Sequence, residues 1–517
     1  MSADEGVSIS PGKQDADNSL SGIAKSGVIS LTGALTSAIM GFGLILVLGR
    51  TLGENQSGIV LQAIAVFSIA LAVARMGLDT TGVWLLPRIA VSSPRVIRPA
   101  VISMLIPAAV FGSLGALVLW FGAPIFASAE PGADELVAAV RNIAWFLPAG
   151  SVMMVGLQIT RGLGDIIPFA VIGNIAVPTA RPALAILVVA LGGTAVAVAM
   201  SWTLPLAFGA VLTLWVVVKR VNAAGHQTTD SVYESATRKV LQKRIWRFAA
   251  PRWYASILEQ SITWFDVVIV GFITGASAAG IYGAASRFVT AGLIISTAMR
   301  IVVSPRFSSL LEQRRTSDVQ TLYTTTVTWV VLFGTPIFVV FICFPETILG
   351  WLGEGFESGA TVLLMLSAAT LISMMFGNAD SLLMMSGRSG LLALNKSIVL
   401  IVNVVGNILL VPLLGIEGAA IIWSVSILLN CILAASQNAK FLGIGWGGRK
   451  VLYSLLVALI CSAIPCFVVV LLLGKTTGAL IVSVALLLTI LAIWCFMDRK
   501  RLGLSELVAL RRSRRAN

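Results

Sequence analysis

The chain has 517 residues, of which 57% are apolar and only 11% are charged. This composition excludes a soluble globular protein and is typical of a protein that lies in a membrane. The formal net charge of +13 would suit nucleic-acid binding, but the basic residues are spread over short loops between apolar segments, so we expect no nucleic-acid partner.

Fourteen segments are long and apolar enough to cross a bilayer. A spanning helix needs about 20 mostly apolar residues, because the hydrocarbon layer is about 30 Å thick. In chain order, the segments cover approximately 28–49, 58–74, 100–122, 137–159, 167–190, 194–218, 252–274, 279–302, 326–345, 359–385, 391–412, 416–436, 451–473 and 477–497. They predict an all-α polytopic membrane protein with fourteen transmembrane helices.

The loops between these segments alternate in charge. With Met1 on the cytoplasmic side, the inside loops carry Arg75, Arg88, Arg95, Arg98, Arg161, Arg300, Arg306, Arg314 and Arg315, and seven more basic residues lie between 219 and 250. The outside loops carry Glu54, Glu130, Asp134, Glu135, Glu346, Glu354, Glu357 and Glu417, against Arg50 and Lys475. Basic residues are enriched in cytoplasmic loops, so the pattern predicts that both termini are cytoplasmic.

Both ends of the chain are polar. Residues 1–25 lack the basic start and the small-residue cleavage site of a removed signal peptide, so we predict a disordered cytoplasmic segment before a retained first helix. Residues 498–517 end in RRSRRAN and predict a basic cytoplasmic tail that lies at anionic headgroups.

One glycine pattern occurs twice. Residues 49–59 read GRTLGENQSGI and residues 271–281 read GFITGASAAGI, so three glycines and an isoleucine recur 222 positions later. Further on, Gly164, Gly192, Ala197 and Ser201 recur at an offset of 223 as Gly387, Gly415, Ala420 and Ser424. Six helices per copy would give both copies the same orientation in the membrane. We predict two pseudo-symmetric six-helix lobes, an N-lobe (26–218) and a C-lobe (251–440), with a cytoplasmic linker (219–250) between them and two further helices (441–497).

Three stretches carry a family resemblance. WFDVVIVGFITGASAAGIYGAASRF (264–288), PRFSSL (305–310) and PLLGIEGAA (412–420) resemble the polysaccharide flippases of the multidrug/oligosaccharidyl-lipid/polysaccharide exporter superfamily. The resemblance implies that two lobes rock about a central cavity by alternating access, without a cofactor. The substrate would be a polyprenyl-pyrophosphate-linked oligosaccharide, such as a lipopolysaccharide O-antigen, capsule or exopolysaccharide unit, carried from the inner to the outer leaflet of the bacterial inner membrane. Partners would be membrane lipids and polysaccharide polymerase or export proteins.

Charged residues within spans are costly and therefore mark candidate sites. Glu259 and Asp266 lie on the span 252–274, and Arg287 lies on the span 279–302. The depths of Asp266 and Arg287 would allow an ion pair across this hairpin. Such a pair either locks the two helices together or forms a proton or cation site, and so Glu259 and Asp266 are candidates for coupling. The equivalent positions in the first half are Ser37, Leu44 and Ala65, so the fold does not require these charges.

Arg181 lies within the span 167–190, next to Pro182. Its guanidinium either bonds to backbone carbonyls and water or faces the cavity, where it would bind the pyrophosphate together with Arg287. Arg300 either extends to the inner surface or lines the cavity, as the resemblance implies. Asp380, Asn378 and Lys396 are interpreted as polar groups near loops.

The sequence offers no enzyme site. The five cysteines all lie in predicted spans, the single histidine is His226 in the linker, and LGKTTG (473–478) lacks the first glycine of a phosphate-binding loop. We therefore predict no metal and no cofactor. An O-antigen ligase or polymerase would need a larger outside loop than 123–136. Two alternatives in the same superfamily stay open, a lipid II-type flippase and a drug/cation antiporter.

The predicted topology can be tested with reporter fusions or cysteine labelling. Sites after residues 130 and 354 should report outside, and sites after residues 235 and 510 should report inside, because the loop charges alternate. An opposite result at any of the four sites would contradict this topology.

Overall fold

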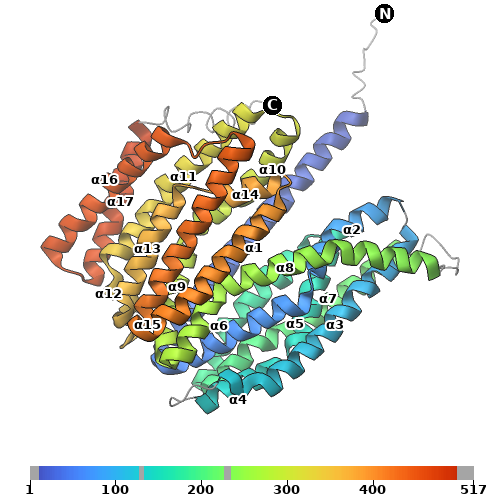
Figure 1. Ribbon diagram of the computed structural model, residues 1–517, viewed down its shortest axis with the longest axis horizontal. Helices are drawn as coiled ribbons and strands as arrows, with labels where there is room; N and C mark the ends of the chain where they lie inside the picture. Colours follow the sequence, from blue (N-terminus) through green and yellow to red (C-terminus); the bar gives the residue numbers. More distant parts are fainter. Residues whose placement is uncertain (1–10, 93, 127–132, 226–234, 498–517) are drawn as a thin grey trace, which may run out of the picture.

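The computed structural model describes residues 11–92, 94–126, 133–225 and 235–497, and throughout these ranges the regular elements are helices (Figure 1). Ten helices are long and apolar enough to cross a membrane, and the number rises to twelve if two bent pairs, α4 with α5 and α9 with α10, each count as one span. The protein is therefore an all-helical polytopic membrane protein.

The helices form two bundles (Figure 1). One contains α2 (Leu78–Ser92), α3 (Ile97–Gly122), α4 (Ala133–Ala144), α5 (Leu147–Gly162), the π-helical η3 (Phe169–Ala176), α6 (Val177–Ala190) and α7 (Ala195–Gly225). The other contains α9 (Ala276–Gly292), α10 (Ile294–Glu312), α11 (Thr316–Cys343), α12 (Pro345–Gly350), α13 (Ala360–Met374), α14 (Ala379–Met385), α15 (Ser389–Leu442), α16 (Gly448–Leu473) and α17 (Thr477–Met497). Both α1 (Pro11–Arg75) and α8 (Ser235–Thr274) contact helices of each bundle.

The N-terminal end of the chain differs from the sequence prediction, and the structure adds detail to the linker. Helix α1 begins at Pro11, whereas we predicted disorder through residue 25. Most of the linker is helical, because α7 continues to Gly225 and α8 begins at Ser235. His226 and the basic tail 498–517 lie outside the described residues.

Two of the long helices turn at a glycine. Helix α1 is interrupted at Gly53 (φ 72°, ψ 179°) and α15 at Gly415 (φ 59°, ψ −136°). Gly275, the predicted counterpart of Gly53, has φ 89° and ψ 173°, and Gly192, the counterpart of Gly415, has φ 77°. Only glycine adopts such backbone angles without strain. Equivalent glycines of the sequence repeat thus turn the chain with backbone angles in the same positive-φ, left-handed region.

The two halves of the repeat touch at another matched pair, Gly58 on α1 and Gly280 on α9. A Cβ atom on Gly58 would lie 1.7 Å from the carbonyl oxygen of Ala276, and one on Gly280 would lie 2.2 Å from that of Glu54. Glu54 and Ala276 are themselves 222 positions apart. The contact is therefore reciprocal, as around a two-fold axis, and it requires the absence of both side chains.

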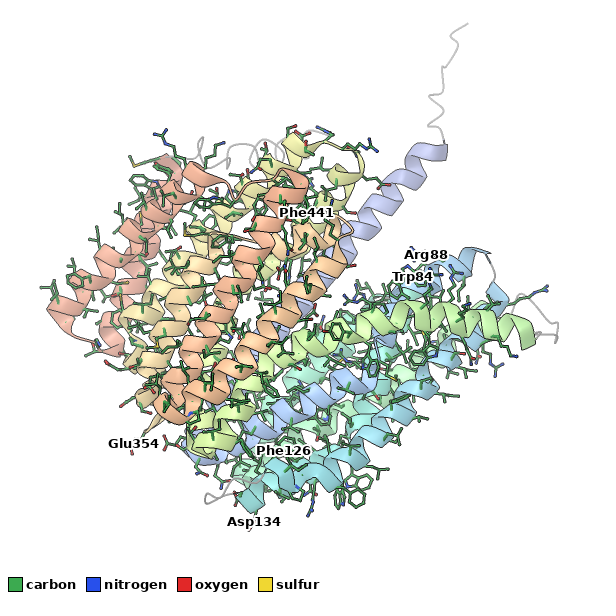
Figure 2. The ribbon with its side chains drawn as sticks, viewed as in Figure 1. Trp84, Arg88, Phe126, Asp134, Glu354 and Phe441 are labelled. Carbon is green, nitrogen blue, oxygen red and sulfur yellow. The ribbon has the colours of Figure 1, made fainter. Side chains whose placement is uncertain are left out.

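The two bundles converge at one end of the molecule and diverge from it (Figure 1). Figure 2 shows Asp134 and Glu354 near the convergent end, whereas Arg88 and Phe441 lie toward the divergent ends. Asp134 and Glu354, which the sequence assigned to one side of the membrane, thus lie at the opposite end of the bundles from Arg88, which it assigned to the other side.

Gly58→Ala tests the crossing, because the new methyl group must displace the backbone of α9. We expect a loss of about 1–3 kcal/mol in stability, measured as a lower unfolding temperature of the detergent-solubilised protein. Gly41→Ala is the matched control, since nothing lies within 4 Å of a Cβ atom on Gly41. Equal stability of both variants would contradict the close crossing.

Candidate functional site

Asp266 lies at the centre of a buried polar cluster. Its side chain is 3% exposed. One carboxylate oxygen accepts a hydrogen bond from the hydroxyl of Tyr282 on α9 (3.2 Å), and the other accepts one from Nδ2 of Asn407 on α15 (3.0 Å). Nδ2 of Asn407 also contacts Oδ1 of Asn403 at 3.2 Å, and both asparagines are fully buried. Three helices, α8, α9 and α15, therefore contribute polar groups to one point.

The ion pair between Asp266 and Arg287 is not formed. The Arg287 guanidinium lies over the Trp264 ring, with Cζ 3.6 Å from the ring centroid. Its Nε and Nη2 are buried and have no hydrogen-bond partner among the described residues. The prediction was wrong because each group contacts a different partner. An amide and a hydroxyl donate to the carboxylate, and the ring of Trp264 on α8 covers the guanidinium, which belongs to α9.

Arg181 adopts a similar arrangement in the other bundle. Its Cζ lies 3.7 Å from the centroid of Trp202 on α7, and its Nε donates to the Trp202 carbonyl oxygen at 3.2 Å. The side chain is half-buried. A backbone carbonyl thus satisfies part of the guanidinium, in line with the structural alternative for this residue.

The other two predicted site residues are exposed. Glu259 on α8 and Arg300 on α10 both present solvent- or lipid-accessible surface. Within the described part of the chain, neither side chain forms a hydrogen bond or an ion pair with the Asp266 cluster, so the structure groups Asp266 with Asn403 and Asn407 rather than with Glu259.

A second polar cluster contains Asp380 and Lys396, which we interpreted from the sequence as polar groups near loops. They lie on α14 and α15 and form an ion pair of 2.8 Å. Nδ2 of Asn430 donates to the same carboxylate oxygen at 3.0 Å. Beside them, the side-chain amides of Asn395 and Gln437 exchange two hydrogen bonds of 2.9 and 2.7 Å. These contacts join α14 and the two parts of α15.

Sequence reasoning missed the asparagines. Asn395, Asn403 and Asn407 lie at spacings of eight and four residues in an otherwise apolar segment, so they share one face of a helix. That spacing could have identified Asn403 and Asn407 as neighbours of a buried acid and Asn395 as a further polar group on the same face. Across the described residues, no group of three His, Cys, Asp or Glu side chains is placed to hold a metal ion.

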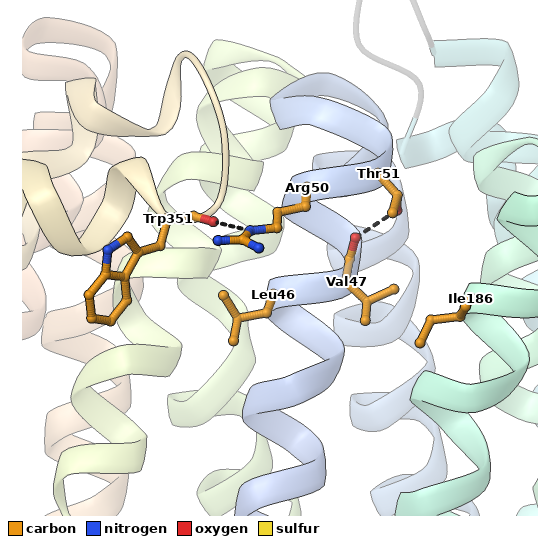
Figure 3. Close-up of a pocket in the computed structure, with 6 residues that line it drawn as sticks. All are labelled: Leu46, Val47, Arg50, Thr51, Ile186 and Trp351. Carbon is orange, nitrogen blue, oxygen red and sulfur yellow. Dashed lines mark hydrogen bonds between the residues drawn. The ribbon is translucent and has the colours of Figure 1, made fainter. Parts of the chain in front are cut away.

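Two pockets lie on either side of Trp351. The larger, about 420 Å³, is lined by Leu46, Val47, Arg50, Thr51, Ile186 and Trp351 (Figure 3). The smaller, about 260 Å³, is lined by Phe42, Phe288, Ala291, Gly292, Ile337, Val340, Phe341, Ile348, Trp351 and Leu480. None of the five predicted site residues lines either pocket.

Comparison with known families decides the classification. A model described as "Polysaccharide biosynthesis protein" matches residues 23–311, more than half of the chain. The chain belongs to this family. A second model, MatE, matches residues 251–416. The polysaccharide biosynthesis family is one of transporters, which confirms the resemblance and means that the chain is not an enzyme.

Two archaeal relatives, both from Haloferax volcanii, match part of this family member. "Probable low-salt glycan biosynthesis flippase Agl15" is 25% identical over 183 residues, which is 35% of this chain and 39% of the relative. "Probable flippase AglR" is 27% identical over 205 residues, which is 38% of this chain and 42% of the relative. The matches thus span about two fifths of the length of these relatives.

Solved structures share the fold at low sequence identity. "Lipid II flippase MurJ, inward closed conformation" has a TM-score of 0.66 and 13% identity, and covers 92% of this chain and 99% of that chain. An inward-facing multidrug resistance MATE family transporter has a TM-score of 0.60 and 13% identity, and covers 83% of this chain and 98% of that chain. This polysaccharide biosynthesis protein therefore has the fold of the superfamily to which both transporters belong.

Arg287→Met tests whether the buried guanidinium holds the fold. Methionine keeps an apolar contact with Trp264 and removes a charge that has no bonded partner at two of its nitrogens, so we expect an unchanged or higher unfolding temperature. Arg181→Met is the control: it loses the bond to the Trp202 carbonyl, and we expect a loss of about 1–3 kcal/mol. A larger loss for Arg287→Met than for Arg181→Met would mean that Arg287 is structural.

Proposed function

We propose that this protein is a flippase that moves a polyprenyl-pyrophosphate-linked oligosaccharide from the inner to the outer leaflet of a bacterial cytoplasmic membrane by alternating access. Membership of the polysaccharide biosynthesis family supports the substrate class. The names of the two archaeal relatives point in the same direction. The glycan would be an O-antigen, capsule or exopolysaccharide unit, with polymerase or export proteins as partners.

The observation that carries the proposal is the buried guanidinium of Arg287. Donors without partners in a membrane interior are costly, and an anionic group that reaches them offsets that cost. A pyrophosphate accepts paired hydrogen bonds from a guanidinium. Arg181 and Arg300 are the further candidates for anion binding along the route.

We assign coupling to the Asp266 cluster. A buried carboxylate can take up a proton or a monovalent cation. Nδ2 of Asn407 and the hydroxyl of Tyr282 donate to Asp266, and Oδ1 of Asn407, which has no partner among the described residues, is a further oxygen in this cluster. Glu259, on the same helix but exposed, is the second candidate. Since Leu44 stands at the position equivalent to Asp266, coupling would reside in the second half alone.

The architecture that we propose has fourteen spans. The twelve spans of the structure, counting bent pairs once, become fourteen when α1 is divided at Gly53 and α15 at Gly415. The N-lobe (26–218) and C-lobe (251–440) would then be related about the Gly58–Gly280 crossing. Residues 441–497 would add two helices, and both termini and the linker 219–250 would be cytoplasmic.

A lipid II-type flippase is the second candidate, because the structure aligns with the lipid II flippase over 92% of the chain. The fold similarity to a MATE family transporter makes a drug/cation antiporter a third candidate. The three differ in substrate, so substrate accumulation separates them.

Depletion of the protein should leave lipid-linked oligosaccharide in the cytoplasmic leaflet and reduce surface polysaccharide, because translocation would be lost while synthesis continues. Protection of the labelled glycan from an external glycosidase would measure its leaflet. The wild-type chain should restore the distribution and Arg287→Met should not. Accumulation of lipid II would favour the second candidate, and fully assembled chains left unligated outside would contradict the proposal.

A further inference from the structure

A polar contact joins α1, which belongs to the predicted N-lobe, to the bundle that contains α12, at the end where α1 turns at Gly53. Nε of Arg50 on α1 donates to the carbonyl oxygen of Trp351 at 2.8 Å, across 301 positions of sequence (Figure 3). Trp351 directly follows α12. Carbonyls at a helix C-terminus carry partial negative charge and attract cations, which explains why a guanidinium binds there.

The segment that follows Trp351 lies along α1. A Cβ atom on Gly49 would lie 2.8 Å from Cβ of Leu352, and one on Gly355 would lie 2.2 Å from a carboxylate oxygen of Glu54. Small residues on both sides thus allow the backbones to meet. Arg50 supplies the charged side-chain bond in this contact.

The fold repeat does not require Arg50. Its equivalent in the second half, 222 positions later, is Phe272, which is 52% exposed. The Arg50 side chain is itself exposed and borders the pocket of about 420 Å³. A cation that faces this pocket, and that appears in only one half, has a role other than packing.

We propose that Arg50 is the latch that holds this end of the transporter closed, by binding the carbonyl of Trp351. The neighbouring Gly58–Gly280 crossing stays in contact when the bundles rotate, and the Arg50–Trp351 bond is the one that breaks. Release of Trp351 separates the segment 351–355 from α1 and opens the pocket beside Val47. The inference goes beyond the proposed function, since it concerns the closing contact and not the substrate.

A cysteine at Val47 reports the opening, because this half-buried side chain lines the pocket. A membrane-impermeant maleimide is added to right-side-out vesicles, in which the proposed topology exposes the Gly53 end, and to inverted vesicles. We expect slow labelling of Val47→Cys alone from the Gly53 side. Adding Arg50→Gln should increase that rate several-fold, and Arg50→Lys, which keeps the charge, should give a smaller increase. The chain without Val47→Cys corrects for its five native cysteines.

Arg141→Gln is the matched control. Nε of Arg141 also donates to a tryptophan carbonyl, that of Trp120 at 3.2 Å, but both residues belong to one bundle. It should leave the labelling of Val47→Cys unchanged. Unchanged labelling in Arg50→Gln, at normal folding, would overturn the latch, and so would an equal increase in Arg141→Gln. The assay needs no substrate, so failure of the proposed flippase activity would leave its outcome intact.

Discussion

The close crossing of α1 and α9 at Gly58 and Gly280 is the contact on which the placement of the other helices depends. Each backbone occupies the space that a side chain on the other would need. Equivalent residues face one another, so the contact has the symmetry of the sequence repeat. In a membrane, where apolar side chains gain little by leaving the lipid, such close approach is a main source of helix association.

The two halves of the sequence repeat differ in the polar residues that they bury, although their folds are related by this symmetry. The buried cluster around Asp266 lies on α8, α9 and α15. The half-buried Asp380–Lys396 pair lies on α14 and α15. At the position of Asp266 the first half has Leu44, which is buried in the apolar core. Because the same hairpin folds without the acid, the cost of burying it supports the coupling role that we propose for it.

Two arginines stack on tryptophan rings, but they differ in how many of their hydrogen-bond donors have a partner. Arg181 uses both the ring of Trp202 and its carbonyl oxygen. Arg287 uses the ring of Trp264, and its buried Nε and Nη2 have no partner among the described residues. Hydrogen-bonding capacity that is left over in the membrane interior is what distinguishes Arg287 as the candidate for an anionic ligand.

The sequence by itself determined the membrane class, the order of the spans and the positions of the paired glycine turns, because hydrophobic length and backbone freedom are local properties. It also identified Asp266, Arg181 and Arg287 as charged residues within the predicted spans, because a charge in an apolar segment can be recognised from the sequence. Only the tertiary structure decided their neighbours. Asn407 reaches Asp266 across 141 positions and Trp351 reaches Arg50 across 301, and such contacts depend on how whole helices pack. The predicted Asp266–Arg287 pair failed for this reason: equal depth in a hairpin places two charges at one level, but the neighbouring helices decide which groups each of them meets.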